Sequence, residues 1–344
     1  MSEDAPQREA DHIEGVAPPE LTPTLVGHEA QLAAVRDQIA AGRLPSGMMI
    51  HGPLGIGKAT FAFTLAREIL TATGDEDAHR VDEQVRAGSH PNLFVLRKAP
   101  RDTKGFYTVI RVDEVRALKD RMHHTRGRAG HRVAIIDAID DANASAANAL
   151  LKILEEPPPD TAFLLISHRP GGLLPTIKSR CHQIALRPLP DAGVRAVLEA
   201  AGAPAQRIGD AVGLAQGRPR RGFEALKLAD ATGIAALRGW LESPATTERG
   251  SQLALADALG GDRDGAAARF ARELMLERIA QEARDAALAG PEARRRLASA
   301  SELWEKAQAL FSDADSLNLD FRQTLVSVFD AMRAHFSRTP AEPR

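Results

Sequence analysis

The stretch that decides the fold is Gly52-Pro-Leu-Gly55-Ile-Gly57-Lys58. An apolar run, Gly47–His51, comes directly before it, and Lys58–Leu70, with apolar residues at helical spacing, comes directly after it. In a strand–loop–helix unit of this kind, glycines let backbone N–H groups turn inward, the helix N-terminus adds partial positive charge, and the lysine reaches the outer phosphates of a nucleotide. The sequence therefore predicts a P-loop, whose nucleotide-binding residues are Gly52, Gly55, Gly57 and Lys58.

Further apolar runs predict the rest of a parallel sheet. Helical stretches, among them one from about Asn143 to Glu155, separate these runs, which are Leu93–Leu96, Arg132–Asp137, Ala162–Ser167 and Gln183–Leu186. Strands that alternate with helices are typical of an α/β core with a parallel sheet. After Pro190 the strand signals end, and Ala/Leu/Arg-rich helical segments follow.

The patterns divide the chain into parts. We expect a disordered acidic tail over residues 1–20, a P-loop core over 21–188, a small helical lid over 189–240 and an all-helical domain over 241–344. Near the end, Phe321, Leu325, Val328 and Met332 form one apolar stripe at helical spacing. The stripe predicts packing between helices of this chain, with a dedicated partner surface as the alternative.

Composition excludes several classes of protein. The net charge is −2, without the basic excess of an autonomous DNA-binding domain, so any contact with DNA is expected to be local or shared with partners. Cys181 is the single cysteine, which excludes disulfides within the chain and a cysteine-rich zinc site. No apolar run is long enough to span a membrane, and the acidic start is unlike a signal peptide. We therefore expect a cytoplasmic protein with no membrane partner.

The predicted nucleotide site lacks two of its chemical groups. Ala59 stands where a P-loop needs the Ser or Thr hydroxyl that holds Mg²⁺, and the Thr60 hydroxyl is rotated away by about 100°. Asp137, at the end of an apolar strand, is placed to orient the metal, but Ala138 follows where related ATPases carry a glutamate. Loss of general-base catalysis is typically worth roughly 10²–10⁴-fold in rate. Asp140 is expected to begin the next helix.

Longer motifs carry a family resemblance. The run Asn148-Ala-Leu-Leu-Lys-Ile-Leu-Glu-Glu-Pro-Pro158 and the tripeptide Ser179-Arg180-Cys181 resemble the clamp-loader branch of the AAA+ ATPases. His90-Pro-Asn-Leu93, the segment Ile110–Leu118 and Val26-Gly-His-Glu29 resemble, within that branch, the delta-prime family of bacterial DNA polymerase III subunits. The resemblance covers roughly residues 21–226.

The resemblance implies both fold and function. The fold would be a RecA-like AAA+ P-loop core with a parallel sheet, a small helical lid and an all-α C-terminal collar that joins a ring. The chain would be no enzyme on its own, but a hydrolysis-incompetent subunit of a DNA-directed DNA polymerase holoenzyme, a nucleotidyltransferase. It would form a hetero-oligomer with gamma/tau and delta subunits, and act on the sliding clamp and primed DNA through that complex.

The resemblance also implies roles for single residues. Arg180 would be an arginine finger that acts in trans, beside the phosphate held by the adjacent subunit. Ser167 matches the sensor-1 position, and Arg220, in Gly217-Arg-Pro-Arg220-Arg221, matches the sensor-2 arginine.

No cofactor is expected to be required, although Lys58 and Asp137 leave binding of ATP or ADP without hydrolysis open. Many relatives carry a cysteine zinc module after the P-loop helix, but Thr71–Ser89 contains no cysteine, and we expect no zinc. Two other functions stay open: an active ATPase that uses Thr60 or Asp140, and an AAA+ adaptor outside replication.

Overall fold

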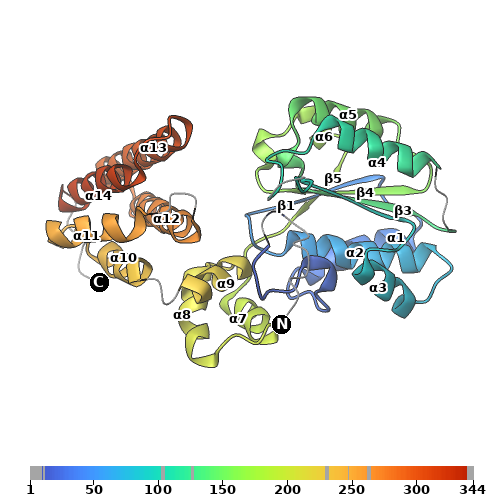
Figure 1. The fold of residues 1–344 in the computed structure, drawn as a ribbon, viewed down its shortest axis with the longest axis horizontal. Coiled ribbons are helices and arrows are strands. Elements are labelled where there is room, and N and C mark those ends of the chain that lie inside the picture. Colours follow the sequence, from blue (N-terminus) through green and yellow to red (C-terminus); the bar gives the residue numbers. More distant parts are fainter. Residues whose placement is uncertain are drawn as a thin grey trace. The chain divides into compact units, whose positions relative to one another are not determined.

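A computed structural model describes residues 10, 12–101, 105–124, 128–228, 232–246, 248–261 and 265–338. The chain divides into two compact units, Met1–Phe223 and Glu224–Arg344. Figure 1 shows the sheet and its covering helices in the first unit and helices alone in the second. No helix of the described segments is long and apolar enough to cross a membrane.

The first unit contains a five-stranded parallel sheet with the order β2-β3-β4-β1-β5. Its strands are β1 (Gly47–His51), β2 (Leu93–Arg97), β3 (Arg132–Asp137), β4 (Thr161–Ser167) and β5 (His182–Ala185). Every predicted strand is present within one residue at each end. The predicted fold class, a P-loop α/β core followed by all-α regions, is confirmed.

Helices cover both faces of this sheet (Figure 1). One face is covered by α1 (Glu29–Ala40), α2 (Lys58–Thr73) and α3 (Ala78–Ala87), and the other by α4 (Val112–His124), α5 (Ala144–Glu155) and α6 (Pro175–Lys178). Because side chains alternate along a strand, Val133 and Ile135 of β3 join the cluster under α2, while Ala134 and Ile136 join the cluster under α5. Burial of both faces explains why the central strands are continuous apolar runs.

Three short helices follow the sheet: α7 (Asp191–Ala200), α8 (Ala205–Ala215) and α9 (Pro219–Leu228). α7 packs against α8. Gly217, between α8 and α9, has φ +73°, and a Cβ there would lie 2.5 Å from the backbone oxygen of Leu189. Glycine therefore lets the start of α9 approach the end of the core.

The second unit consists of α10 (Thr232–Glu242), α11 (Arg249–Leu259), α12 (Ala266–Leu288), the short 3₁₀ helix η4 (Pro291–Ala293), α13 (Arg294–Ser316) and α14 (Phe321–Arg338). The predicted lid boundary between residues 240 and 241 differs from the division of the chain, because all of α10 belongs to the second unit. α10 packs against α11 and α12, and the chain divides after Phe223 instead. Buried Trp240 explains this placement, since its ring lies 4.7 Å from that of Phe329 on α14.

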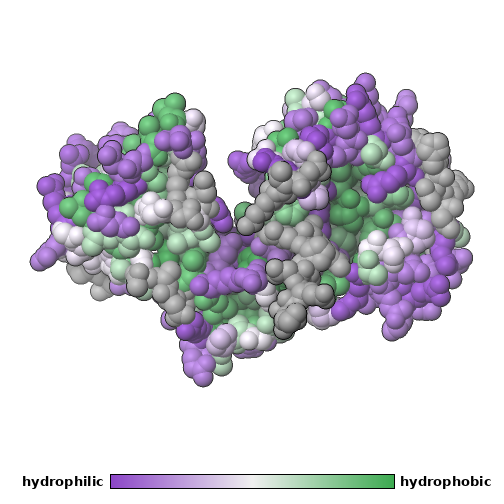
Figure 2. Space-filling model, in the orientation of Figure 1, coloured by the Kyte–Doolittle hydropathy of each residue, from purple (hydrophilic) through white to green (hydrophobic). Residues whose placement is uncertain are grey.

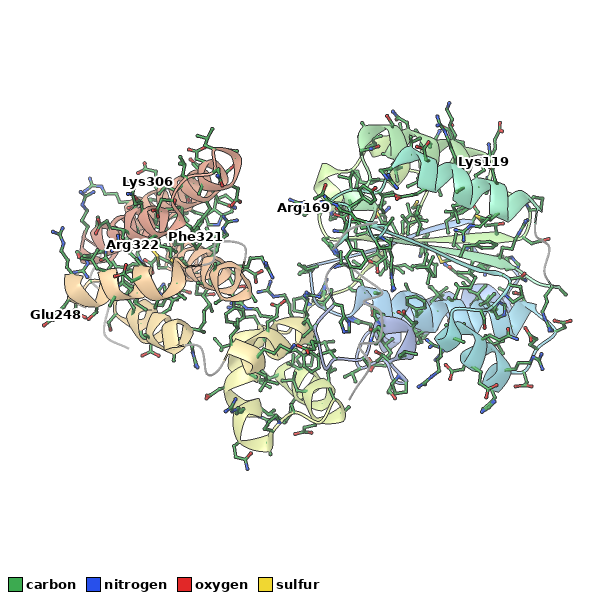
Figure 3. The ribbon with its side chains drawn as sticks, in the orientation of Figure 1. Lys119, Arg169, Glu248, Lys306, Phe321 and Arg322 are labelled. Carbon is green, nitrogen blue, oxygen red and sulfur yellow. The ribbon has the colours of Figure 1, made fainter. Side chains whose placement is uncertain are left out.

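The predicted apolar stripe lies on α14, which begins at Phe321 beside Arg322 (Figure 3). All four of its residues, Phe321, Leu325, Val328 and Met332, are buried within the unit. The prediction of packing between helices is therefore confirmed. On the face of this unit in view in Figure 2, hydrophilic and hydrophobic areas are interspersed.

The acidic tail predicted over residues 1–20 falls largely on residues 1–9 and 11, which lie outside the described residues. Its end needs a correction, because Glu20 lies in the 3₁₀ helix η1 (Pro19–Leu21) and is only 6% exposed. Arg67 of α2 donates a hydrogen bond to the Glu20 backbone oxygen at 2.5 Å, and the Glu20 carboxylate pairs with Arg97 at 3.2 Å. These contacts attach residues 19–21 to the core.

A buried carboxylate connects three helices of the second unit. Glu282 of α12 accepts hydrogen bonds from Arg296 of α13 at 2.6 and 3.1 Å and pairs with Arg278 at 3.5 Å. His335 of α14 lies 3.6 Å from the same carboxylate and shares a 2.8 Å hydrogen bond with Ser299. Burial alone would raise the pKa of Glu282, but the hydrogen bonds and charges of Arg296 and Arg278 outweigh burial and lower it.

Glu282→Gln is expected to destabilise the helical unit by about 3 kcal/mol, since breaking a buried ion pair by removing one partner typically costs 3–5 kcal/mol and both arginines here keep some contact with water. Both tryptophans of the chain, Trp240 and Trp304, lie in this unit, so urea unfolding followed by tryptophan fluorescence reports on it alone. The exposed Glu292→Gln is the matched control. Equal stability of the two variants would contradict the structural role.

The same network gives the unit a pH dependence. Burial lowers the pKa of His335 despite the nearby Glu282 carboxylate, and the pKa of Glu282 is also below its ordinary value. Groups whose pKa is lower in the folded state contribute stability above their unfolded pKa, and that contribution is lost as pH falls. The stability contributed by these groups should therefore be complete above about pH 6.5 and decline below it.

Candidate nucleotide site and arginine finger

The P-loop lies where β1 ends and α2 begins. Gly52 has φ +152°, and a Cβ there would lie 2.4 Å from the backbone oxygen of Leu186. Gly55 has φ +84°, and its Cβ would lie 2.8 Å from that of Arg220. Gly57, with φ +95°, is the N-cap of α2. The glycines thus allow the tight loop in front of a helix N-terminus that a phosphate cradle requires.

Lys58 is folded onto this loop. Its Nζ donates hydrogen bonds to the backbone oxygens of Gly52 at 2.8 Å and Pro53 at 2.7 Å. Burial lowers the pKa of Lys58 to about 8, against the opposing influence of Asp137 and Asp140. Lys58 therefore remains mainly a cation at neutral pH, and the loop residues fit the phosphates of a nucleotide.

Asp137 and Ser167 end β3 and β4, so both lie at the edge of the sheet where the P-loop begins. Ser167 is fully buried, and its Oγ donates to Asp140 Oδ1 at 3.1 Å. Asp140 also accepts from the backbone N–H groups of His168 at 2.6 Å and Arg169 at 3.0 Å. Asp140 lies in the short 3₁₀ helix η2 (Ile139–Asp141), and α5 is capped by Asn143 instead.

The motif pattern gives no indication of one further residue at this edge, Arg97. It ends β2, and its Nε lies 3.5 Å from Oδ2 of Asp137. The next residue, Lys98, pairs with Asp141 at 2.9 Å. The sequence signal that could have found them is the pair Arg97-Lys98 directly after an apolar run. Which carboxylates they meet depends on the strand order, and the sequence pattern does not show that order.

The predicted sensor-2 residue lies against the P-loop. The backbone N–H of Arg220, in α9, donates to the Gly55 oxygen at 3.2 Å. The structure thus brings together the predicted residues Gly52, Gly55, Gly57, Lys58, Asp137, Ser167 and Arg220 at one edge of the sheet. Arg180 is the exception.

Arg180 lies at the opposite end of the strands, where their amino ends are, two residues before β5 begins. Its backbone oxygen lies next to Gly47, the first residue of β1, where a Cβ would be 3.1 Å away. The P-loop begins only after the five residues of β1, so about 16 Å of strand separates the two. Arg180 therefore does not belong to the phosphate site of its own chain.

The tripeptide around Arg180 has one buried and two exposed residues. Cys181 is buried in the cluster under α5, and burial raises the pKa of its thiol to about 11. The Ser179 Oγ donates to the Thr176 oxygen at 3.1 Å. The Arg180 guanidinium is exposed, donates to the same oxygen at 3.0 Å and pairs with Glu155 at 2.7 Å. The buried thiol fixes the backbone, and the arginine faces outward.

A second carboxylate network occupies the segment Thr71–Ser89, where the resemblance raised the question of a zinc module. Glu76, before α3, accepts hydrogen bonds from Arg80 at 2.8 Å and Gln84 at 3.0 Å, and pairs with Arg128 at 3.2 Å and His90 at 3.5 Å. Its side chain is only 5% exposed. No metal-binding group of three or more His, Cys, Asp or Glu side chains is found among the residues that the structure describes. Two arginines, a glutamine and a histidine surround the carboxylate, whereas a metal would need free oxygens.

Comparison with known proteins gives the same assignment as the motifs. Residues 27–190 match the family described as DNA polymerase III, delta subunit. DNA polymerase III subunit delta' of Pseudomonas aeruginosa is 43% identical over 148 residues, which are 42% of this chain and 43% of that protein. Subunit delta' of Bacillus subtilis is 31% identical over 156 residues, 44% of this chain and 45% of that protein. The resemblance to delta-prime subunits is confirmed.

The similarity to delta-prime has a limited extent. The chain spans less than half the length of the two curated delta-prime relatives. A solved structure of a DNA polymerase III gamma subunit-related protein from Thermotoga maritima is 20% identical, with a TM-score of 0.43, and the alignment covers 89% of this chain and 99% of that one. The matched part, residues 27–190, contains the P-loop, Asp137, Ser167 and Arg180.

Glu76→Gln is expected to destabilise the first unit by about 1.5–3 kcal/mol, because hydrogen bonds to charged groups typically contribute that much. Circular dichroism during urea unfolding measures the change, and the exposed Glu83→Gln on α3 is the control. Elemental analysis of the purified chain should detect no stoichiometric zinc. One zinc per chain, or equal stability of the two variants, would contradict a metal-free network in this segment.

Proposed function

We propose that the chain is a hydrolysis-incompetent delta-prime subunit of a DNA polymerase III clamp loader. It assembles with gamma/tau and delta subunits into a ring that uses ATP to place the sliding clamp on primed DNA. Its own contribution to ATP hydrolysis is Arg180, inserted in trans beside the phosphate of the adjacent subunit. In this role it is a subunit of a DNA-directed DNA polymerase holoenzyme.

The position of Arg180 is the observation that carries the proposal. Arg180 is separated from its own P-loop by the length of β1, about 16 Å. It is therefore not placed to contact a phosphate bound at that P-loop. It is exposed and held on a backbone fixed by buried Cys181. Such a residue suits a partner's nucleotide. A guanidinium beside the transferred phosphate stabilises the transition state by roughly 10³–10⁵-fold in other NTPases.

The ion pair of Arg180 with Glu155 is compatible with this role. Both side chains are more than one third exposed, and exposed pairs contribute only about 0–1 kcal/mol to stability. Arg180 can therefore exchange Glu155 for a phosphate at little cost. Glu155 belongs to the same clamp-loader motif, Asn148–Pro158, and keeps the guanidinium at the surface until a neighbour is present.

Two features support the lack of hydrolysis in the chain's own site. Ala59 and Ala138 supply neither a metal-binding hydroxyl nor a carboxylate base. Asp140, the substitute that an active ATPase would need, accepts three hydrogen bonds from Ser167, His168 and Arg169. A carboxylate whose lone pairs are used in this way is a poor general base, which disfavours the alternative of an active ATPase.

The surface of the helical unit supports assembly with partners. Leu253, Leu288, Trp304, Leu317 and Leu319 are large apolar side chains with 40–87% of their surface exposed. Tryptophan is enriched among the residues that dominate binding energy at interfaces, so Trp304 is the strongest candidate among them. The buried stripe of α14 is used within the chain, so we assign the collar contacts to these exposed residues. The delta-prime resemblance favours a clamp loader over an AAA+ adaptor outside replication.

The purified chain is expected to hydrolyse ATP at no measurable rate, because the missing base alone typically lowers the rate by roughly 10²–10⁴-fold. Release of phosphate, measured with and without primed DNA, tests this. Turnover that persists through purification and is abolished by Lys58→Ala would show that the chain is an ATPase.

Arg180→Ala is expected to lower DNA-stimulated ATP hydrolysis by the assembled ring, together with clamp loading. The loss at the adjacent site should be about 10³-fold or more, so the total rate falls by that site's share. Stability should change by no more than about 0.5 kcal/mol, because the substitution lies at an exposed position, and ring assembly should persist.

Two variants serve as controls for that experiment. Lys178→Ala removes a nearby positive charge from α6 and should leave hydrolysis unchanged. Lys58→Ala alters this chain's own P-loop and should affect loading less than Arg180→Ala does. A larger effect of Lys58→Ala would mean that the chain works through its own nucleotide site.

A further inference from the structure

A P-loop fold implies a magnesium ion, and the ligand positions of this site show how well one would fit. Ala59 has no oxygen to offer. The remaining ligand position is Asp137, whose Oδ2 lies 3.5 Å from Nε of Arg97. Mg²⁺ requires a near-octahedral set of oxygens, usually with at least one free carboxylate. The carboxylate that would hold the ion faces a guanidinium instead.

The strand register puts these two side chains together. Arg97 and Asp137 are direct neighbours on the parallel strands β2 and β3. Residues two apart on a strand point to the same face of the sheet. Val95 and Ile135, two residues before Arg97 and Asp137, pack in the apolar cluster under α2, so Arg97 and Asp137 point to that face as well. This is the face of the P-loop helix. Arg97 and Asp137 therefore meet on the sheet face that α2 covers, and not at the solvent-exposed surface.

Other contacts hold Arg97 in this position. Its NH2 group donates to Glu20 at 3.2 Å, and its guanidinium carbon lies 5.3 Å from the ring centre of Phe63 on α2. The Arg97 side chain is 13% exposed, Asp137 is 16% exposed and Glu20 is 8% exposed. A guanidinium stays charged at any pH that the fold survives, and it has no lone pair for a metal. Asp137 thus has a permanent cation beside it.

We infer that Arg97 is a built-in counter-ion that takes the place of magnesium at Asp137, so that the P-loop receives the phosphates of a nucleotide without a metal ion. To bind there, Mg²⁺ would have to approach a charged guanidinium or displace it from Asp137. The inference deepens the proposed function at the same site and does not depend on ring assembly. The positive charge of Arg97 would then be a third obstacle to hydrolysis, besides the missing hydroxyl at Ala59 and the missing carboxylate at Ala138.

Arg97→Gln tests this, with Lys98→Gln as a matched control, because Lys98 is the next residue and pairs with Asp141 instead of Asp137. Isothermal titration of the isolated chain with ATP, once with EDTA and once with excess Mg²⁺, gives the effect of the metal on affinity. In the wild-type chain and in Lys98→Gln, Mg²⁺ should not strengthen binding. In Arg97→Gln, it should strengthen binding about tenfold or more, as removal of a unit charge about 5 Å from a divalent ion predicts in a mostly aqueous site.

Two results would overturn the inference. One is Mg²⁺ that strengthens ATP binding to the wild-type chain, and the other is no gain from Mg²⁺ in Arg97→Gln. If Arg97→Gln does not fold because Glu20 loses its partner, the double variant Glu20→Gln/Arg97→Gln removes both charges and gives the same readout. Neither result bears on hydrolysis, because every variant keeps Ala138. Steady ATP turnover by the wild-type chain would refute the proposed function. It would not decide the role of Arg97, which the titrations test separately.

Discussion

The common direction of the five strands is the constraint on which the site depends. In a parallel sheet all carboxyl ends lie at one edge, and the order β2-β3-β4-β1-β5 makes the ends of β3, β4 and β1 neighbours. The P-loop, Asp137 and Ser167 meet there because each follows or ends one of these strands. The same direction sends the residues before β5 to the other edge. One geometric rule thus separates the phosphate cradle from Arg180.

Buried charge is the second organising feature. Glu20, Glu76 and Glu282 are carboxylates with little exposed surface, and each is paired with at least one arginine. Removing a carboxylate from water is costly unless hydrogen bonds and opposite charges compensate, so each network fixes the segments that supply its partners. Glu20 attaches η1 to the core, Glu76 holds α3 near the loop before β3, and Glu282 joins α12, α13 and α14. The P-loop edge follows the same rule, with Arg97 beside Asp137.

These features describe a chain that keeps the residues of a phosphate cradle and carries alanine at two positions where a P-loop ATPase has a metal-binding hydroxyl and a carboxylate base. Lys58 and the glycines keep the geometry of a nucleotide site, whereas the metal and base positions carry Ala59 and Ala138. Of the carboxylates that remain, Asp137 lies 3.5 Å from the Arg97 guanidinium, and Asp140 accepts hydrogen bonds from its neighbours. On the proposed function, this site would hold a nucleotide without hydrolysing it, and the exposed Arg180 at the amino ends of the strands would act on a partner's nucleotide.

The sequence by itself determined the elements and their order along the chain. Apolar runs with glycine-rich or helical flanks located all five strands within one residue, because strand and helix periodicity are short-range properties. The P-loop followed from the same local pattern, and so did the defects at Ala59 and Ala138. The tripeptide around Arg180 was recognisable as a motif, but the edge on which it lies depends on which strands are neighbours.

Only the tertiary structure decided which charges meet. Arg97 stands forty residues before Asp137 and Glu20 far before both, and nothing in their spacing indicates that they pair. The register of β2 against β3 creates the contact. The division of the chain after Phe223 also depends on long-range packing, since Trp240 is placed by Phe329 and not by its neighbours in sequence. Ion pairs and domain boundaries are made by residues distant in sequence, and local periodicity carries no information about them.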